Sequence, residues 1–225
     1  MSSSIPAGIV LAPGLIHVPG HLDAAAQACL CAELDAVLGL APAYTPRMPR
    51  TGKPFSVRMT NCGALGWVSD RAGYRYQPHH PESGAPWPAI PATALAAWAA
   101  LADYPAPPEA CLVNLYGAQA RMGLHQDRDE EALDAPVVSL SLGATALFRY
   151  GGLARSDPTR SVRLRSGDAL VIGGPARLIH HGVDRLIVEE PDLLQGGPAP
   201  ASAGFLPPEG RCNLTLRRVT RPRDA

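Results

Sequence analysis

From residue 110 onward the sequence is a succession of short apolar stretches separated by turns rich in glycine and proline. The stretches are CLVNLY, PVVSLSLG, ATALFRY, SVRLR, ALVIGG, RLIHHGV and RCNLTLRRV, and the turns include GG, SGD and GGP. Short strands at this spacing are typical of an antiparallel sandwich or barrel of the jelly-roll type. We therefore expect a mainly β fold with residues 110–219 as its core.

The first 109 residues follow a different pattern, with one helix expected near each end. A helix over 21–40 is predicted to begin after the N-cap Asp23 and to stop at Gly39. Its apolar residues recur at helical spacing: Leu30, Leu34, Val37 and Leu38. A second helix is predicted over 91–103 from the apolar residues of an alanine-rich run: Leu95, Trp98 and Leu101. Both helices should pack on a sheet.

Residues 41–90, between these helices, are predicted to form a cover of strands and loops. The alternating stretch 55–60 predicts a strand that closes at 61–63. The cover also contains a basic run that no acidic residue interrupts: Arg47, Arg50, Lys53 and Arg58. Taken alone, such a run is most simply explained as a solvated face.

Composition limits the class of protein. The 225 residues suit one large domain or two small ones, and the 20 basic residues balance the 20 acidic ones. Zero net charge argues against binding of nucleic acid over the whole surface, but it allows one local basic patch. The five scattered cysteines are expected to be buried apolar residues. Because no secretory signal or long apolar stretch occurs, we expect a cytoplasmic protein without membrane contact.

Two predicted strands have a polar face, because residues two apart share a face. Asn114 and Tyr116 lie on one strand, and a second row follows on the last strand: Arg211, Asn213, Thr215 and Arg217. One such row would be best explained by an exposed sheet face, but two rows in a helix-covered barrel make a polar lumen a competing explanation. Paired guanidinium and amide groups would suit a small dicarboxylate.

A candidate metal site lies in the same region. His125 and Asp127 are two residues apart and project together from an extended backbone, and His181 follows in RLIHHGV. Two histidines and one carboxylate are the ligand set of non-haem Fe(II) oxygenases, although zinc or manganese would use the same atoms. The HxD pair alone is weak evidence. Its coincidence with a distant histidine and a terminal Arg-x-Asn-x-x-x-Arg strand strengthens it.

These segments together resemble the AlkB family of Fe(II)- and 2-oxoglutarate-dependent dioxygenases. The resemblance runs from about residue 55 to 219 in separated blocks: SVRMTNCGALGW (56–67), GYRY (73–76), PWPAIP (86–91), ACLVNLYGAQARMGLHQDRDE (110–130), APVVSLSLG (135–143), FRYGGLARSDP (148–158), SGDALVIGGPARLIHHGV (166–183) and RCNLTLRRV (211–219). It implies an α+β fold: one dioxygenase domain, 1–225, with a double-stranded β-helix (jelly-roll) core over 110–219. Residues 1–109 would supply helices and a nucleotide-recognition lid, and 220–225 a tail. The composition of 191–210, rich in proline and glycine, separately predicts a loop.

The resemblance also implies roles for individual residues. Fe(II) would be held by His125, Asp127 and His181, where His181 is preferred to His180 because the family places its ligand before Gly182. Arg211 would bind the distal carboxylate of 2-oxoglutarate and Arg217 its metal-proximal end, together with the remaining positions: Asn114, Tyr116 and Asn213. Substrate would be contacted by a further set: Met59, Trp67, Tyr74, Tyr76, Asp129 and Arg155.

The implied activity is oxidative demethylation of N-alkylated bases such as N1-methyladenine and N3-methylcytosine, a direct form of DNA repair. Formaldehyde would be released while O₂ and 2-oxoglutarate give succinate and CO₂. Trp67 would attract the cationic base and Asp129 its exocyclic amine, and the basic run would hold phosphates beside a flipped base. The expected partner of this monomer is alkylated single-stranded DNA, with RNA open. The alternatives are a modified tRNA base, a protein side chain, or a non-catalytic nucleic-acid-binding jelly roll.

Overall fold

The computed structural model describes residues 8–187, 204–206 and 209–222. Two antiparallel sheets form its core, as the strand pattern predicted. The larger sheet has seven strands, in this order: β1 (Ile9–Ala12), β2 (Leu15–Val18), β11 (Ala169–Ile172), β8 (Val137–Gly143), β13 (Arg211–Arg217), β6 (Ala110–Tyr116) and β3 (Val57–Gly63). The smaller has four: β10 (Arg160–Leu164), β9 (Thr145–Tyr150), β12 (His181–Ile187) and β7 (Met122–His125).

Apolar side chains from both sheets pack face to face, which makes the arrangement a jelly roll. Leu15, Val137 and Leu170 of the larger sheet meet Phe148 of β9 in one buried cluster. A second cluster joins β3 and β6 to β9 and β12. The strands cross over between the sheets, because the neighbours of β8 in the larger sheet are β11 and β13, which are not adjacent to it in the sequence. This topology pairs β7 with β12. It therefore brings His125 and His181 together, although 55 residues lie between them in the sequence.

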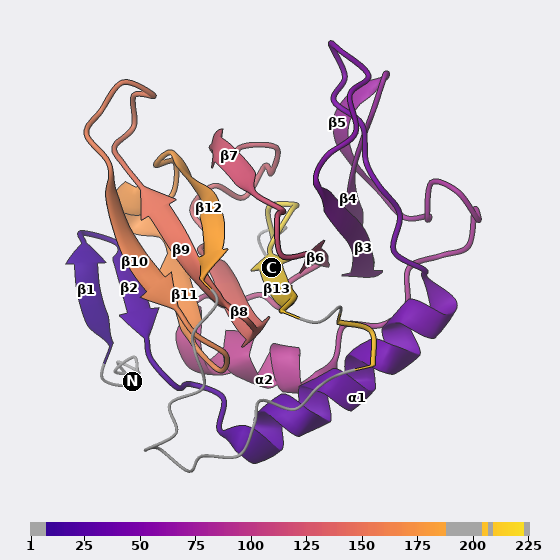
Figure 1. The fold of residues 1–225 in the computed structure, drawn as a ribbon, viewed down its shortest axis with the longest axis horizontal. Coiled ribbons are helices and arrows are strands. Elements are labelled where there is room, and N and C mark those ends of the chain that lie inside the picture. Colours follow the sequence, from indigo (N-terminus) through magenta and orange to yellow (C-terminus); the bar gives the residue numbers. More distant parts are fainter. Residues whose placement is uncertain (1–7, 188–203, 207–208, 223–225) are drawn as a thin grey trace.

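Two helices cover the outer face of the larger sheet (Figure 1). They are α1 (Ala24–Leu40) and α2 (Ala92–Leu101). Leu30 and Leu34 of α1 and Trp98 of α2 are buried against the sheet, where they meet the apolar faces of β6 and β13. Because these helices take the apolar side of the sheet, the polar rows of β6 and β13 face the opposite sheet.

The register between β6 and β13 places the polar rows side by side. Arg211 is paired with Tyr116, and Asn213 with Asn114. All four side chains line one cavity between the sheets. The predicted polar lumen is therefore correct, and the exposed-face explanation is wrong.

A small hairpin stands apart from the two main sheets. Its strands are β4 (Gly66–Asp70) and β5 (Gly73–Gln77), and Trp67 pairs with Tyr76 in its register. β4 contacts β3 and β6. The hairpin forms part of the expected cover over residues 41–90, although the sequence did not reveal its strands.

Several boundaries differ from the predictions. Asp23 caps α1 as expected by accepting a hydrogen bond from Ala26 N, but the helix continues through Gly39 to Leu40. Leu95 is 38 % exposed, because Ala94 and Ala97 complete the buried face that Trp98 and Leu101 form on α2. β3 continues through 61–63 instead of closing there. In RLIHHGV, only His181 and the residues after it are extended; a short 3₁₀ turn, η1 (Gly174–Ala176), precedes them.

Three further strands and one exposed cysteine were not predicted from the sequence, and two predicted segments lie partly outside the described residues. Strands β1, β2 and β7 were not predicted. Cys29 is exposed, whereas the remaining cysteines are buried as expected. Most of the loop expected over 191–210, and the end of the tail, lie outside the described residues. In the part of the chain that is described, no helix is long and apolar enough to span a membrane.

Candidate active site and metal centre

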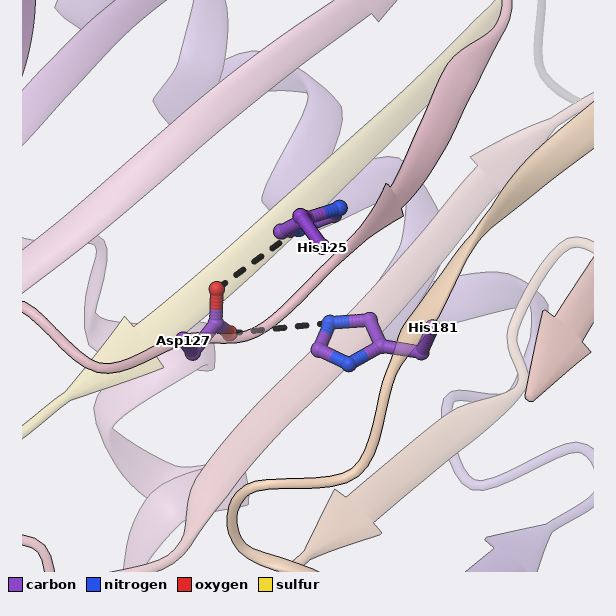
Figure 2. A group of neighbouring side chains, drawn as sticks. All are labelled: His125, Asp127 and His181. Carbon is purple, nitrogen blue, oxygen red and sulfur yellow. Dashed lines mark ion pairs between the residues drawn. The ribbon is translucent and has the colours of Figure 1, made fainter. Parts of the chain in front are cut away.

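His125, Asp127 and His181 converge on one point in the cavity. His125 ends β7, His181 begins β12, and the two residues are direct cross-strand partners. Asp127 follows β7, and its carboxylate is directed at both rings from one side (Figure 2). Its Oδ1 is 3.6 Å from His125 Nε2, and its Oδ2 is 3.8 Å from His181 Nε2.

The donor atoms of this cluster suit a divalent transition metal. All lie within 4.8 Å of one another. Ligands about 2.1 Å from one ion and at right angles to each other are about 3 Å apart, so a small side-chain adjustment would close the site. Both rings are held by backbone carbonyls: His125 Nδ1 lies 2.9 Å from Gly123 O, and His181 Nδ1 lies 3.2 Å from Ile179 O. With Nδ1–H as the donor, each Nε2 lone pair faces the cluster.

The protonation states also favour metal binding. Burial alone would raise the pKa of Asp127, but Arg217 and the two imidazoles outweigh burial and hold that pKa well below its ordinary value. Burial, together with His125, lowers the pKa of His181 to about 4. Asp127 is therefore ionised and His181 neutral near pH 7, as ligands of a divalent cation must be.

A cavity of about 530 Å³ contains the cluster and a deep cationic end. At that end Arg211 is 1 % exposed. Its Nη2 donates to Ser141 Oγ at 2.7 Å, and its Nη1 donates to the carbonyls of Ala144 and Leu164 at 3.2 Å. Arg211 Nε and Asn114 Oδ1 are buried and have no hydrogen-bond partner within the described residues. A guanidinium with a free donor at the bottom of a cavity fits a carboxylate.

Aromatic side chains line the mouth of the same cavity. Trp67 stacks on Tyr74, with ring centroids 5.5 Å apart and planes 18° from parallel. Trp67 Nε1 donates to Asp129 Oδ2 at 2.8 Å, and Asn61 holds the Trp67 backbone through two hydrogen bonds of 3.0 Å. Tyr74 is 51 % exposed. The mouth can therefore present a flat aromatic surface beside a carboxylate.

Two more residues with expected substrate roles also line the cavity. Met59 of β3 is 1 % exposed in its wall. Arg155 is exposed at its rim, where Nη1 donates to Leu124 O at 2.7 Å. The structure thus brings the expected metal, anion and substrate residues to one cavity, with one exception. Tyr76 does not border the cavity, and its hydroxyl points instead to Glu130.

The sequence did not reveal Glu130 or Arg177, and it left the role of His180 open. Glu130 and Arg177 form a buried ion pair of 3.0 Å behind Asp127. His180 borders the cavity beside His181, and its Nδ1 has no partner among the residues described. Glu130 lies three residues after Asp127 in HQDRDE, and a carboxylate so close to the candidate ligand was the available signal. No sequence pattern links it to Arg177.

Comparison with known proteins agrees with this geometry. The model of the 2OG-Fe(II) oxygenase superfamily matches residues 14–217. An alpha-ketoglutarate-dependent dioxygenase AlkB homolog of Caulobacter vibrioides is 50 % identical over 94 % of this chain and 90 % of its own length. AlkB of Salmonella typhimurium is 41 % identical over 93 % and 92 %. The chain belongs to the AlkB family of 2-oxoglutarate- and Fe(II)-dependent dioxygenases.

A solved structure supports the same assignment. The structure of OsALKBH1 superimposes with a TM-score of 0.74 at 32 % identity and covers 94 % of this chain and 99 % of that one. As an AlkB-family dioxygenase, the enzyme uses Fe(II), 2-oxoglutarate and O₂. The cavity fits these groups, because it combines a His-Asp-His cluster with a buried guanidinium whose Nε is free.

Proposed function

We propose that this dioxygenase demethylates N-alkylated bases of nucleic acid, N1-methyladenine and N3-methylcytosine in particular. The observation that carries the proposal is the order of groups along one cavity: Arg211 at the bottom, the His-Asp-His cluster above it, and the pair Trp67–Tyr74 at the mouth. AlkB and nucleic acid dioxygenase ALKBH1 are among the named relatives. The cavity therefore suits a base that enters from the mouth with its methyl group towards the cluster.

The metal and cosubstrate would be held by the deeper residues. His125, Asp127 and His181 would bind Fe(II) through two imidazole nitrogens and a carboxylate oxygen. 2-Oxoglutarate would lie with its distal carboxylate on Arg211, near the polar groups of the lumen: Asn114, Tyr116, Asn213 and Arg217. When bound, iron and 2-oxoglutarate supply, with O₂, the oxidation that hydroxylates the N-methyl group and yields succinate and CO₂. The hydroxymethylated base then releases formaldehyde.

The mouth would select a cationic, unpaired base. N1-methyladenine and N3-methylcytosine carry a positive charge, so Trp67 and Tyr74 attract them by stacking and by cation–π interaction. Asp129 keeps Oδ1 available for an exocyclic amine while Oδ2 accepts from Trp67. Met59 and Arg155 would complete the contacts at the wall and the rim. Because the methyl group lies on the Watson–Crick edge, the base must be single-stranded or flipped out.

The remaining parts of the chain fit a nucleic acid substrate. Arg47, Arg50, Lys53 and Arg58 are exposed on the cover next to the cavity residue Met48, where they would contact phosphates. We infer that the chain acts as a single catalytic domain, as a cytoplasmic monomer, and on single-stranded DNA, with RNA as the competing polymer. A small local basic surface is sufficient for this task, because the cavity supplies the specificity.

The function can be tested with oligonucleotides that contain one N3-methylcytosine. With Fe(II) and 2-oxoglutarate, we expect formaldehyde in an amount equal to the succinate that depends on the oligonucleotide, after subtraction of the succinate formed without it. Trp67→Ala should raise KM for the oligonucleotide about tenfold, because stacking on one aromatic ring contributes about 1–3 kcal/mol per base, while 2-oxoglutarate turnover without substrate is retained.

DNA and RNA versions of the oligonucleotide compare the two polymers. Succinate without formaldehyde from either oligonucleotide would indicate that the enzyme acts on another substrate, and no succinate at all would indicate a non-catalytic protein.

A further inference from the structure

Glu130 joins three separate parts of the fold next to the candidate metal site. Its Oε1 accepts a hydrogen bond of 2.5 Å from the hydroxyl of Tyr76, which belongs to the hairpin β4–β5. The same oxygen lies 3.3 Å from Arg217 Nε on β13, and Oε2 accepts from Arg177 Nη2 at 3.0 Å. Glu130 is 6 % exposed. A carboxylate buried to this extent requires several partners, and Glu130 obtains them from the hairpin, from β13 and from Arg177, which follows η1.

Both arginines that bind Glu130 also hold Asp127. Arg217 Nη2 lies 2.9 Å from Asp127 Oδ2, and Arg177 Nη1 donates to the backbone carbonyl of Asp127 at 2.6 Å. Arg177 additionally donates to Ala135 O at 2.9 Å. The position of the Asp127 carboxylate and the path of its backbone therefore both depend on arginines that Glu130 orients.

The charges of this group balance. Asp127 and Glu130 contribute two negative charges, and Arg177 and Arg217 contribute two positive charges. Removal of one member would leave a buried charge without a partner. The resulting loss of stability is far larger than when one member of an exposed ion pair is removed. The four side chains are thus expected to move as one unit, and Tyr76 is the point at which the hairpin is attached to it.

We propose that Tyr76 and Glu130 are positioning residues that couple the seating of the hairpin to the metal-binding arrangement of Asp127. The hairpin also contains Trp67 and Tyr74, so this coupling connects the base-recognition surface to the metal centre. Only the role of Trp67 and Tyr74 in base recognition rests on the proposed function. Because coupling free energy is reciprocal, metal binding at Asp127 stabilises the seated hairpin by the same factor as the hairpin strengthens metal binding.

Tyr76→Phe tests the proposal, since it removes one hydroxyl and keeps the ring. Mn(II) with 2-oxoglutarate serves as a redox-stable probe in the absence of nucleic acid. In the unchanged protein, binding should slow hydrogen exchange of the backbone over 66–77. In Tyr76→Phe, we expect this slowing to be lost and the Kd for Mn(II) to rise about fivefold, the equivalent of one net hydrogen bond.

Tyr104→Phe is the matched control. The Tyr104 hydroxyl also donates to a carboxylate, Asp134 Oδ2 at 3.1 Å, but it is not part of the Glu130 group. This variant should leave both Mn(II) affinity and the exchange of 66–77 unchanged. If Tyr76→Phe behaves as Tyr104→Phe does, the coupling is refuted, and Tyr76 then acts at most on substrate. Because no nucleic acid is present, failure of the demethylase proposal would not affect the result.

Discussion

Arg211 is a guanidinium held in the protein interior by neutral partners. Burial lowers its pKa, and the oxygens that it binds are a serine hydroxyl and two backbone carbonyls. A permanent charge in such surroundings is costly unless an anion completes the site. The Nε of Arg211 has no partner among the described residues, and Arg211 lines the cavity that also contains the His-Asp-His cluster, which indicates where that anion binds.

Arg211→Lys should weaken 2-oxoglutarate binding without abolishing the fold. Lysine keeps the charge but cannot form paired hydrogen bonds to a carboxylate. We expect KM for 2-oxoglutarate to rise roughly tenfold to a hundredfold, the equivalent of one charge-assisted hydrogen bond. Steady-state succinate formation measures this. Arg163→Lys, on the exposed side of β10, is the control. An unchanged KM in Arg211→Lys would mean that the cosubstrate binds elsewhere.

The hairpin β4–β5 shows how one small element can position a recognition surface. Gly66 begins β4 at a place where a Cβ would lie 2.5 Å from the ring of Trp87 and 2.7 Å from Asn61 Cβ. Asn61 in turn holds the backbone of Trp67. The close approach of the backbone at Gly66 therefore fixes the direction in which Trp67 enters the cavity mouth.

Gly66→Ala should displace the hairpin. Because Trp87 is buried, the added methyl group requires a backbone shift, and we expect a loss of about 1–3 kcal/mol in the free energy of unfolding. KM for the methylated oligonucleotide should rise at the same time. Gly117→Ala is the control, since nothing lies within 4 Å of its Cβ position. Chemical denaturation measures the free energy of unfolding of both variants. If the two variants had the same free energy of unfolding and the same KM, Gly66 would not position the hairpin.

The same elements show what the sequence could and could not reveal. The alternation in RCNLTLRRV was sufficient to predict that Arg211 and Asn213 share a face, because side-chain direction along a strand is a local property. The attachment of Tyr76 to Glu130 could not be predicted, since it depends on how a hairpin of five-residue strands packs against β6. Leu95 was misassigned to the buried face of α2 because Ala94 and Ala97, which carry little hydrophobic signal, share that face with Trp98 and Leu101.

At the scale of the whole molecule, two sheets combine groups that lie far apart in the chain. β7 and β12 bring the cluster together, β6 and β13 provide the polar floor, and β3 and the hairpin supply the walls and the mouth. The exposed basic residues lie on the part of the cover that contributes Met48 and Phe55 to the lining of the cavity. A chain of zero net charge can therefore act on nucleic acid, because only one edge of the molecule has to meet phosphates.

Demethylation at the His-Asp-His cluster can be measured as the intact mass of an oligonucleotide with a single N3-methylcytosine after incubation with Fe(II), 2-oxoglutarate and O₂. The unchanged enzyme should remove the mass of one methylene group, and His125→Ala should leave the oligonucleotide unaltered. His79→Ala, which replaces an exposed histidine outside the cavity, should repair it fully. An unaltered mass with the wild-type enzyme would show that the protein does not demethylate this base, and repair by His125→Ala would show that His125 is not a metal ligand.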